Sequence, residues 1–329
     1  MTIAADKNTE TLSTSGSESD VARRARRRIA RRLLPFLFLL YVIAFLDRMN
    51  VGAAALQMPH DLGFSEGVIG MGAGVFFLGY FLLEIPGALI VERWSARRWI
   101  ARIMISWGLV TVFMAFLHTA RQFYVIRFLV GAAEAGFLPG VIVYLTHWFR
   151  YQDRAKAVAF FYAANPLSYV IGSPLAGLLL GLTWLGMRGW RWLFIIEGIP
   201  AVIFGVITIW YLTDWPEQAK WLRADEREWI TAELQREKQA KHSRRSYRVW
   251  EALRHRDVIL LTGSYFCAMT GSYGIAFWLP TILKRLSGKS DLKVTLLAAL
   301  PYVAAFIIQQ LNGWHSDRTG ERRWHAAIP

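Results

Sequence analysis

The sequence predicts an all-α polytopic membrane protein. Of its 329 residues, 54% are hydrophobic. Eight apolar segments are each long enough to span a bilayer, and basic residues concentrate in alternate connectors between them. A helix rises about 1.5 Å per residue, so about 20 apolar residues cross the roughly 30 Å hydrocarbon core. Because lipid offers the backbone no hydrogen bonds, such segments are expected to be helices that pack together.

The apolar segments divide the chain into regions. They cover about 33–57, 66–90, 99–118, 122–146, 155–181, 190–213, 258–284 and 292–314. We expect a disordered basic cytoplasmic tail at 1–32, a six-helix bundle at 33–213 and a cytoplasmic linker with one or two surface helices at 214–257. Residues 258–329 are expected to supply the first two helices of a second bundle and the loop after them. The apolar run after the tail is too long for a signal peptide.

Lysine and arginine residues predict the orientation of the chain. The tail and the connectors near 93–102, 150–156, 214–257 and 318–323 are rich in them, whereas the alternate connectors are poor, apart from 284–293. By the positive-inside rule the richer set, and with it the N-terminus, lies in the cytoplasm. The net charge of +14 then serves topology and contact with anionic membrane lipid. Nucleic-acid binding is not expected, because no basic groove-reading module is visible between the spans.

Four charged residues lie inside the predicted spans. Asp47 and Arg48 are in the middle of the first span, where a charge costs at least about 2.5 kcal/mol and is expected to face a bundle interior. Arg127 and Glu134, seven residues apart, share one face of the fourth span at a similar depth. We expect the four to form one buried, formally neutral cluster, in which protonation of an acid favours an incoming anion. The alternative is an ion-pair lattice that only locks helices together.

A loop pattern occurs twice in the chain. Residues 87–98 and 313–323 each carry a small residue, then a carboxylate beside an arginine, then paired arginines, at the end of the second span of each half. We interpret both loops as a gate between conformations, with simple retention of topology as the alternative. The gating candidates are Glu92, Arg93, Arg97, Arg98, Asp317, Arg318, Arg322 and Arg323.

Together with the basic central linker, these loops resemble the major facilitator superfamily. Three further motifs are FLDRMN at 45–50, RFLVGAAEAGFLPG at 127–140 with the THWF that follows, and RWLFIIEGIP at 191–200. They resemble its anion:cation symporter family, whose members carry organic anions such as sugar acids, tartrate and phthalate with protons. The resemblance covers residues 33–323 and implies two six-helix halves, the second of which stops here after two helices and a loop.

The resemblance also implies roles for individual residues. Asp47 and Glu134 correspond to proton-coupling carboxylates. Phe45 stands where a tyrosine of the family can contribute a hydroxyl group. The positions that correspond to substrate contacts are Arg48, Arg127, Tyr80 and Asn165. Without the resemblance, a tyrosine or an asparagine inside a span is also typical of a helix–helix hydrogen bond.

We therefore expect a secondary active transporter that imports a small organic carboxylate with protons by alternating access. It is expected to be a monomer in the inner membrane of a bacterium. The alternatives are an uncoupled facilitator and a truncated, non-transporting sensor or fragment. Sugar acids, aromatic acids and dicarboxylates all suit two arginines, and sodium stays open as the coupling ion.

Other chemistry is not indicated by the residues. An enzyme or an ATP-driven pump is not expected, because the chain has no P-loop, dinucleotide-binding glycine pattern or nucleophile elbow. No cofactor or metal is expected, since the seven histidines lack metal-ligand spacing. Glu84 and Glu197, each followed closely by glycine and proline, are expected near helix ends in structural roles.

Overall fold

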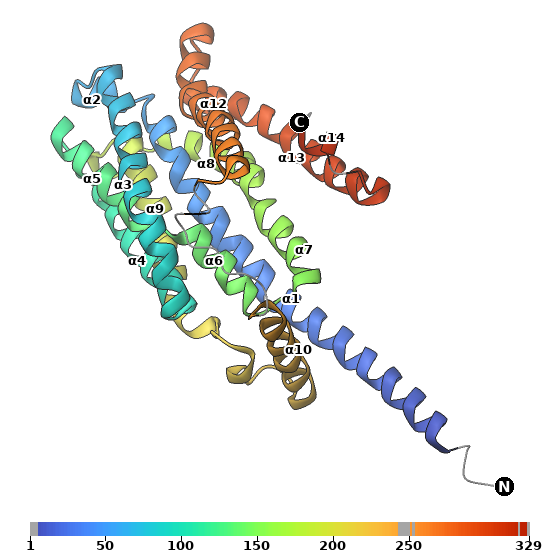
Figure 1. The fold of residues 1–329 in the computed structure, drawn as a ribbon. Helices are drawn as coiled ribbons and strands as arrows, with labels where there is room; N and C mark the ends of the chain where they lie inside the picture. Colours follow the sequence, from blue (N-terminus) through green and yellow to red (C-terminus); the bar gives the residue numbers. More distant parts are fainter. Residues whose placement is uncertain (1–5, 243–250, 252–253, 322, 328–329) are drawn as a thin grey trace.

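Helices make up all the regular secondary structure of the described residues, which confirms the all-α prediction. The computed structural model describes residues 6–242, 251, 254–321 and 323–327 (Figure 1). The short elements are α2 (Met58–Leu62), α14 (Arg323–Ala327) and the 3-10 turns Trp184–Gly186 and Pro216–Gln218. The long helices are α1 (Asp6–Ala54), α3 (Glu66–Arg93), α4 (Ala96–Met114), α5 (Ala120–Glu134), α6 (Phe137–Thr146), α7 (Tyr151–Tyr162), α8 (Ala164–Leu180), α9 (Gly189–Tyr211), α10 (Ala224–His242), α12 (Arg256–Ser287) and α13 (Asp291–Thr319).

Among the described residues, seven helical stretches are long and apolar enough to cross a membrane. They lie in α1, α3, α5 with α6, α7 with α8, α9, α12 and α13. The remaining predicted span, 99–118, corresponds to α4, which carries Arg97, Arg98 and Arg102 in its first two turns. This helix nevertheless packs inside the assembly against α9 and α5. The structure thus places a helix on each of the eight predicted spans.

Two predicted spans are each divided into two helices. Between α5 and α6 the chain turns at Gly136, whose φ of 83° lies in the left-handed region that glycine adopts at little cost. Pro139 and Pro166 stand in the first turns of α6 and α8. Because proline has no N–H to donate to the residue four positions earlier, each interrupts the helical hydrogen bonds at the junction. Both helix breaks therefore follow from local chemistry.

Glycines allow the helices of the first bundle to touch backbone to backbone. A Cβ atom on Gly131 of α5 would lie 2.0 Å from the carbonyl oxygen of Phe76 on α3. A Cβ atom on Gly108 of α4 would lie 2.8 Å from the carbonyl oxygen of Gly198 on α9. Such small residues permit close packing of membrane helices. These contacts bring the polar residues of α4, α5 and α9 up to the middle of α1.

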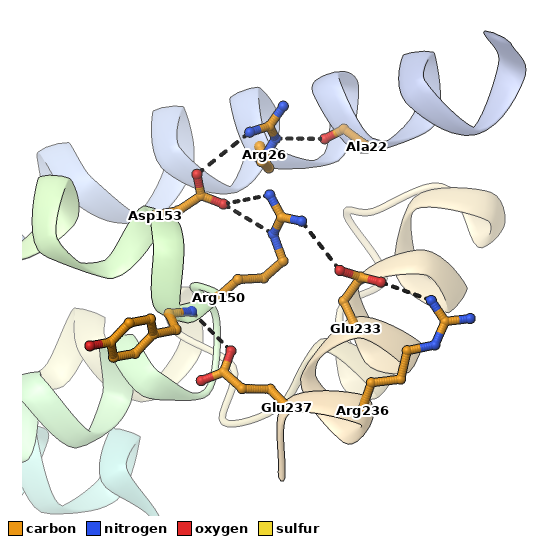
Figure 2. Close-up of polar contacts among 8 residues, drawn as sticks. Ala22, Arg26, Arg150, Asp153, Glu233, Arg236 and Glu237 are labelled. Carbon is orange, nitrogen blue, oxygen red and sulfur yellow. Dashed lines mark hydrogen bonds and ion pairs between the residues drawn. The ribbon is translucent and has the colours of Figure 1, made fainter. Parts of the chain in front are cut away.

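The N-terminal tail is helical, so the prediction of a disordered segment at 1–32 is wrong for its described part. Residues from Asp6 onward belong to α1, and three arginines of this part pair with neighbouring helices. Arg24 and Arg28 pair with carboxylates at the start of α10, at 2.9 and 2.8 Å. Arg26 pairs with Asp153 of α7 at 3.5 Å (Figure 2). Sequence composition suggested a free tail because these partners lie far away along the chain.

The helices α12 and α13, orange and red in Figure 1, lie on the α1 and α8 side of the first bundle. The rings of Tyr169 on α8 and Tyr302 on α13 stack with centroids 4.1 Å apart. Gln57, just after α1, donates to Asp291 at the start of α13 at 3.0 Å. Part of the linker between the two groups of helices forms α10, and residues 243–250 lie outside the described part of the chain.

Candidate functional site

The centre of the site is an ion pair between α1 and α5. Arg48 donates from Nε and Nη2 to the same oxygen of Glu134, at 2.7 and 2.6 Å. Glu134 is the last residue of α5, at the helix break, and only 1% of it is exposed. Its second oxygen, Oε2, is buried and has no hydrogen-bond partner among the described residues. The pair is therefore held at one oxygen only, and the second oxygen is able to take a proton or another donor.

Aromatic rings surround the Arg48 guanidinium. It lies over the rings of Phe45 and Tyr80, at 5.0 and 5.1 Å from their centroids. The face of such a ring attracts a cation. Tyr80 thus lies beside Arg48, and its role as a substrate contact stays a prediction. Its hydroxyl donates to Glu84 at 3.5 Å.

Of the four predicted charges, only Arg48 and Glu134 are in direct contact. Asp47 is buried and accepts from Thr111 Oγ1 of α4 at 3.1 Å and from Asn50 Nδ2 at 3.2 Å. Arg127 is buried and donates from Nε to the Gly72 carbonyl at 3.3 Å. Neither Asp47 nor Arg127 forms an ion pair within 4 Å with a described residue. Consecutive helical residues point about 100° apart, so Asp47 and Arg48 reach different neighbours.

Arg127 stays close to the carboxylates without touching them. Its guanidinium lies 4.5 Å from the centroid of the Phe76 ring, and the charges of Asp47 and Glu134 both act on it. The negative charges of Asp47 and Glu134 also repel each other. The four charged groups thus share one interior, although only Arg48 and Glu134 are in direct contact.

Glu197 was misplaced by the sequence analysis. It lies within α9, away from both ends, and is 5% exposed. The Asn50 amide and the Asp47 carboxylate act on it from α1, and its Oε2 has no hydrogen-bond partner among the described residues. A signal was available, because an acid in the middle of an apolar span is expensive. The nearby Gly198 and Pro200 suggested a helix end, but α9 continues through both.

Glu84 and Asn165 differ from the other candidates. Glu84 also lies inside its helix, α3, and not near its end. Its Oε2 accepts from the backbone N–H of Gly136 at 2.7 Å, so it stabilises the break between α5 and α6. Asn165 of α8 is half-buried, and its side chain makes no hydrogen bond with the described residues. The structure does not bring Asn165 into contact with the charged groups.

The sequence analysis also missed Tyr273 of α12. Its hydroxyl accepts from Arg48 Nη1 at 2.7 Å, and its ring packs edge-on against Phe77 of α3 at 4.9 Å between centroids. Nothing in the pattern of the span 258–284 distinguishes Tyr273 from Tyr265, because both are single tyrosines in an apolar run. Only the packing of α12 on α1 selects it.

The described contacts of each arginine-rich loop are with residues outside the other loop. The backbone N–H of Arg97 donates to Asp214 at 3.0 Å, and Ser95 Oγ donates to the same carboxylate at 2.7 Å. The backbone N–H of Arg98 donates to Ser95 Oγ at 3.1 Å, which caps α4. The missed partner of this loop is therefore Asp214, directly after α9.

Most of the second predicted loop is helical, because residues 313–319 form the last turns of α13 and α14 begins at Arg323. Arg318 and Arg323 lie over the rings of Trp314 and Trp324, at 5.4 and 5.9 Å. Asp317 is exposed. No ion pair is seen between the described side chains of the two loops, and the gating role stays a prediction. The side chains of Glu92 and Arg93, and the whole of Arg322, lie outside the described residues.

No group of three or more His, Cys, Asp or Glu side chains among the described residues is arranged to hold a metal ion. What the site offers is a largely buried guanidinium paired with a carboxylate, and further acids in the same interior.

The chain matches transport proteins along most of its length. Residues 37–328 match the family described as Major Facilitator Superfamily. Two proteins of Agrobacterium vitis named "Putative tartrate transporter" are 49% and 48% identical over 308 residues, covering 93% of this chain and 71% and 68% of theirs. The inner membrane transport protein RhmT of Escherichia coli is 40% identical over 299 residues, covering 90% of this chain and 69% of its own.

Solved structures share the fold. The inward-facing, unoccupied structure of a bacterial homologue of the human lysosomal transporter Spinster aligns with a TM-score of 0.68 at 22% identity, over 88% of this chain and 63% of that one. A D-xylose–proton symporter aligns with a TM-score of 0.63 at 16% identity, over 88% and 69%. The chain thus spans about two thirds of the length of these proteins.

Proposed function

The chain belongs to the major facilitator superfamily, and from this premise we propose that it imports a small organic carboxylate together with protons by alternating access. It is an integral membrane protein of a transporter family and not an enzyme. The proposal includes the N-terminus and α10 on the cytoplasmic side, because the arginine-rich end of the bundle lies there under the positive-inside rule.

The ion pair between Arg48 and Glu134 is the observation that carries the proposal. The side chain of Arg48 is only 14% exposed, and a guanidinium so largely removed from water is costly without a partner, so we propose that Arg48 keeps a carboxylate partner throughout the transport cycle. When Glu134 takes a proton it stops supplying that negative charge. The planar fork of Arg48 can then bind the carboxylate of a substrate with two hydrogen bonds. Protonation of Glu134 thereby replaces its carboxylate, as the partner of Arg48, with the carboxylate of the substrate.

Asp47 and Glu197 form a second acidic position in this proposal. Both are buried, and the groups that donate to Asp47 are the neutral side chains of Thr111 and Asn50. The negative charges of the two carboxylates oppose each other. We propose that this position holds a proton during transport and that Glu197 joins the proton-coupling residues Asp47 and Glu134.

The substrate class follows from the cations and from the relatives. Arg127 offers a second guanidinium in the same interior, while Tyr80 offers a hydroxyl beside Arg48. A compact acid with more than one polar group suits this set. Relatives at 49% and 48% identity carry tartrate in their names, so tartrate, a hydroxy-dicarboxylate, is the first substrate to test. Asn165 and the arginine-rich loops remain proposed contributors, to the substrate site and to gating.

Contacts between the two groups of helices support an inward-open state. Gln57 bonds to Asp291, Arg285 pairs with Glu66, and Arg48 bonds to Tyr273. These contacts lie from the middle of the bundle toward the end that carries Asp291, which is the outer end in the proposed orientation.

The test is uptake of radiolabelled acids into proteoliposomes that contain the full-length product of the gene. An inward acid gradient should drive accumulation of at least one small carboxylate, and a protonophore should abolish it. Neutral sugars of similar size serve as controls. Flux that ignores the gradient would favour an uncoupled facilitator. Binding of the acid without any flux would favour a sensor or fragment.

A further inference from the structure

A basic cavity lies at the proposed cytoplasmic end, away from the ion pair of Arg48. Its volume is about 540 Å³, and it opens where α1 meets the end of α9 and the start of the linker. Its lining residues are Arg24, Arg27, Arg28, Arg31, Arg32, Tyr211, Trp221 and Glu226. Five arginines around one cavity require an explanation, because like charges repel unless anions lie among them.

Three of these arginines pair with no carboxylate among the described side chains. Arg24 and Arg28 bond to Asp225 and Glu226 of α10. Arg27, Arg31 and Arg32 form no ion pair within 4 Å in the described part of the chain. The five arginines less the two that are paired leave an excess charge of three in the cavity.

The side chain of Arg32 is the most constrained of the three. Its guanidinium lies 4.7 Å from the ring centroid of Tyr211 and 5.0 Å from that of Trp221. Its Nε is buried and has no hydrogen-bond partner among the described residues. A buried donor without an acceptor is costly. Arg32 therefore lines the cavity with a guanidinium that two rings hold in place and whose Nε lacks an acceptor among the described residues.

On the opposite side of α1, arginines are paired with carboxylates. In Figure 2, Arg26 and Arg150 both reach Asp153, and Arg150 continues to Glu233 of α10. Arg154 pairs with Glu237 at 3.0 Å. Each arginine of this network has a carboxylate partner. The unbalanced positive charge is thus confined to the cavity side of α1.

The surface next to the cavity is apolar. The membrane-spanning part of α9 ends at Tyr211, and the preceding Trp210 is 74% exposed. Ile203 and Ile209 on the same helix are 50% and 36% exposed. In a membrane protein such a face contacts acyl chains, and tryptophan and tyrosine mark the headgroup level. The cavity therefore lies where the headgroup of a lipid against α9 would be.

We propose that this cavity binds the phosphate headgroup of an anionic phospholipid of the cytoplasmic leaflet. The lipid phosphate accepts from Arg27, Arg31 and Arg32, while its acyl chains lie on the exposed face of α9. A free phosphate would satisfy the arginines but would leave that apolar face uncovered. The bound lipid would connect α1 with the linker, because Trp221 belongs to the linker. The site needs the proposed orientation but not the transport of any carboxylate.

Lipid binding can be measured without transport. The purified, delipidated protein is titrated with phosphatidylglycerol, phosphatidylcholine or inorganic phosphate, and bound lipid is counted by native mass spectrometry. We expect phosphatidylglycerol to bind tightly and phosphatidylcholine weakly. Inorganic phosphate should not displace phosphatidylglycerol at concentrations that are too low to screen electrostatic interactions in general. Equal affinity for phosphatidylcholine would overturn the proposal, and competition by low concentrations of inorganic phosphate would overturn the choice of a lipid.

Variants test whether the cavity itself is responsible. Exchanging Arg27, Arg31 and Arg32 together for glutamine should weaken phosphatidylglycerol binding about a hundredfold, since each basic residue near an anionic surface contributes about 1 kcal/mol. The matched control exchanges Arg23, Lys220 and Arg223 for glutamine, which removes the same charge outside the cavity, and should cost less than threefold. An equal loss in the control would overturn the site.

A single substitution provides a separate test in case the triple variant misfolds. Arg31 is exposed, so Arg31→Gln should leave the fold intact and weaken binding about fivefold. Unchanged binding in Arg31→Gln and in a correctly folded triple variant would overturn the proposal. Loss of carboxylate transport with lipid binding intact would instead count against the proposed function alone.

Discussion

Arg48 donates from Nη1 to the hydroxyl of Tyr273 at 2.7 Å, and this hydrogen bond joins α1 to α12 beside the Arg48–Glu134 ion pair. One guanidinium therefore holds an acid of its own bundle and a tyrosine of the second group of helices. A substrate carboxylate that takes Arg48 must rearrange both contacts. The geometry thus links substrate binding to the contact between the two groups of helices, which is the linkage that alternating access needs.

We predict that Tyr273→Phe loosens this conformation without unfolding the protein. The change removes one hydroxyl that bonds to a charged group, an interaction of about 1.5–3 kcal/mol. The fraction of molecules in the conformation that is closed at the Asp291 end should fall at least tenfold relative to the other conformations. Distances between spin labels on α3 and α12 measure the population. Tyr265→Phe is the matched control on the same helix and should leave the distances unchanged.

We predict that Asp47→Asn and Glu134→Gln abolish proton-driven uptake and leave counterflow exchange partly intact. Both amides resemble the protonated acid in shape and cannot release a proton. Exchange of labelled for unlabelled acid needs no net proton movement. Uptake with and without a pH gradient, measured beside counterflow, separates the two activities. Full gradient-driven uptake by either variant would contradict its assigned role.

We predict that Arg127→Ala removes substrate binding and that Arg127→Lys restores little of it. The guanidinium has a planar fork that a lysine ammonium cannot reproduce. Arg127 is buried and donates to the Gly72 carbonyl, so lysine would keep the charge but not both directions of hydrogen bonding. Binding of labelled acid to the purified variants gives the affinity. Unchanged affinity of Arg127→Ala would remove this residue from the site.

We predict that Glu197→Gln shifts the pH dependence of uptake while the protein remains folded. The buried carboxyl lies near Asp47 and Asn50, so an amide in its place removes one titrating group and its charge. Initial uptake rates across a pH series report the shift, and a purely structural glutamate would leave the profile in place while lowering stability. Glu233→Gln, which lies on the linker helix α10, is the control and should keep the wild-type profile.

We predict that Gly131→Ala destabilises the first bundle. Its new Cβ atom would lie 2.0 Å from the Phe76 carbonyl oxygen, so α3 and α5 must move apart. Overpacking of this kind costs about 1–3 kcal/mol. Gly74→Ala on α3 is the control, because a Cβ atom there meets nothing within 4 Å. Thermal unfolding followed by tryptophan fluorescence should show a lower midpoint for the first variant only.

The sequence by itself determined the class of protein and most of its outline. Hydropathy is a local property, so the eight spans could be read directly, and Asp47, Arg48, Arg127 and Glu134 stood out because charge inside an apolar span is expensive. The loop motifs indicated the superfamily for the same reason: they are short and contiguous. All four charged residues are buried in the bundle, or nearly so, as predicted.

Only the tertiary structure decided which groups meet. The partner of a buried side chain depends on the rotation of its helix and on residues far away in the chain. Composition therefore could not assign Arg48 to Glu134 and Tyr273, or Asp47 to Thr111. The same limit hid Glu197, whose neighbours lie on α1, and it made the tail look disordered although its arginines bind α7 and α10. Long-range packing, which no local pattern records, sets these contacts.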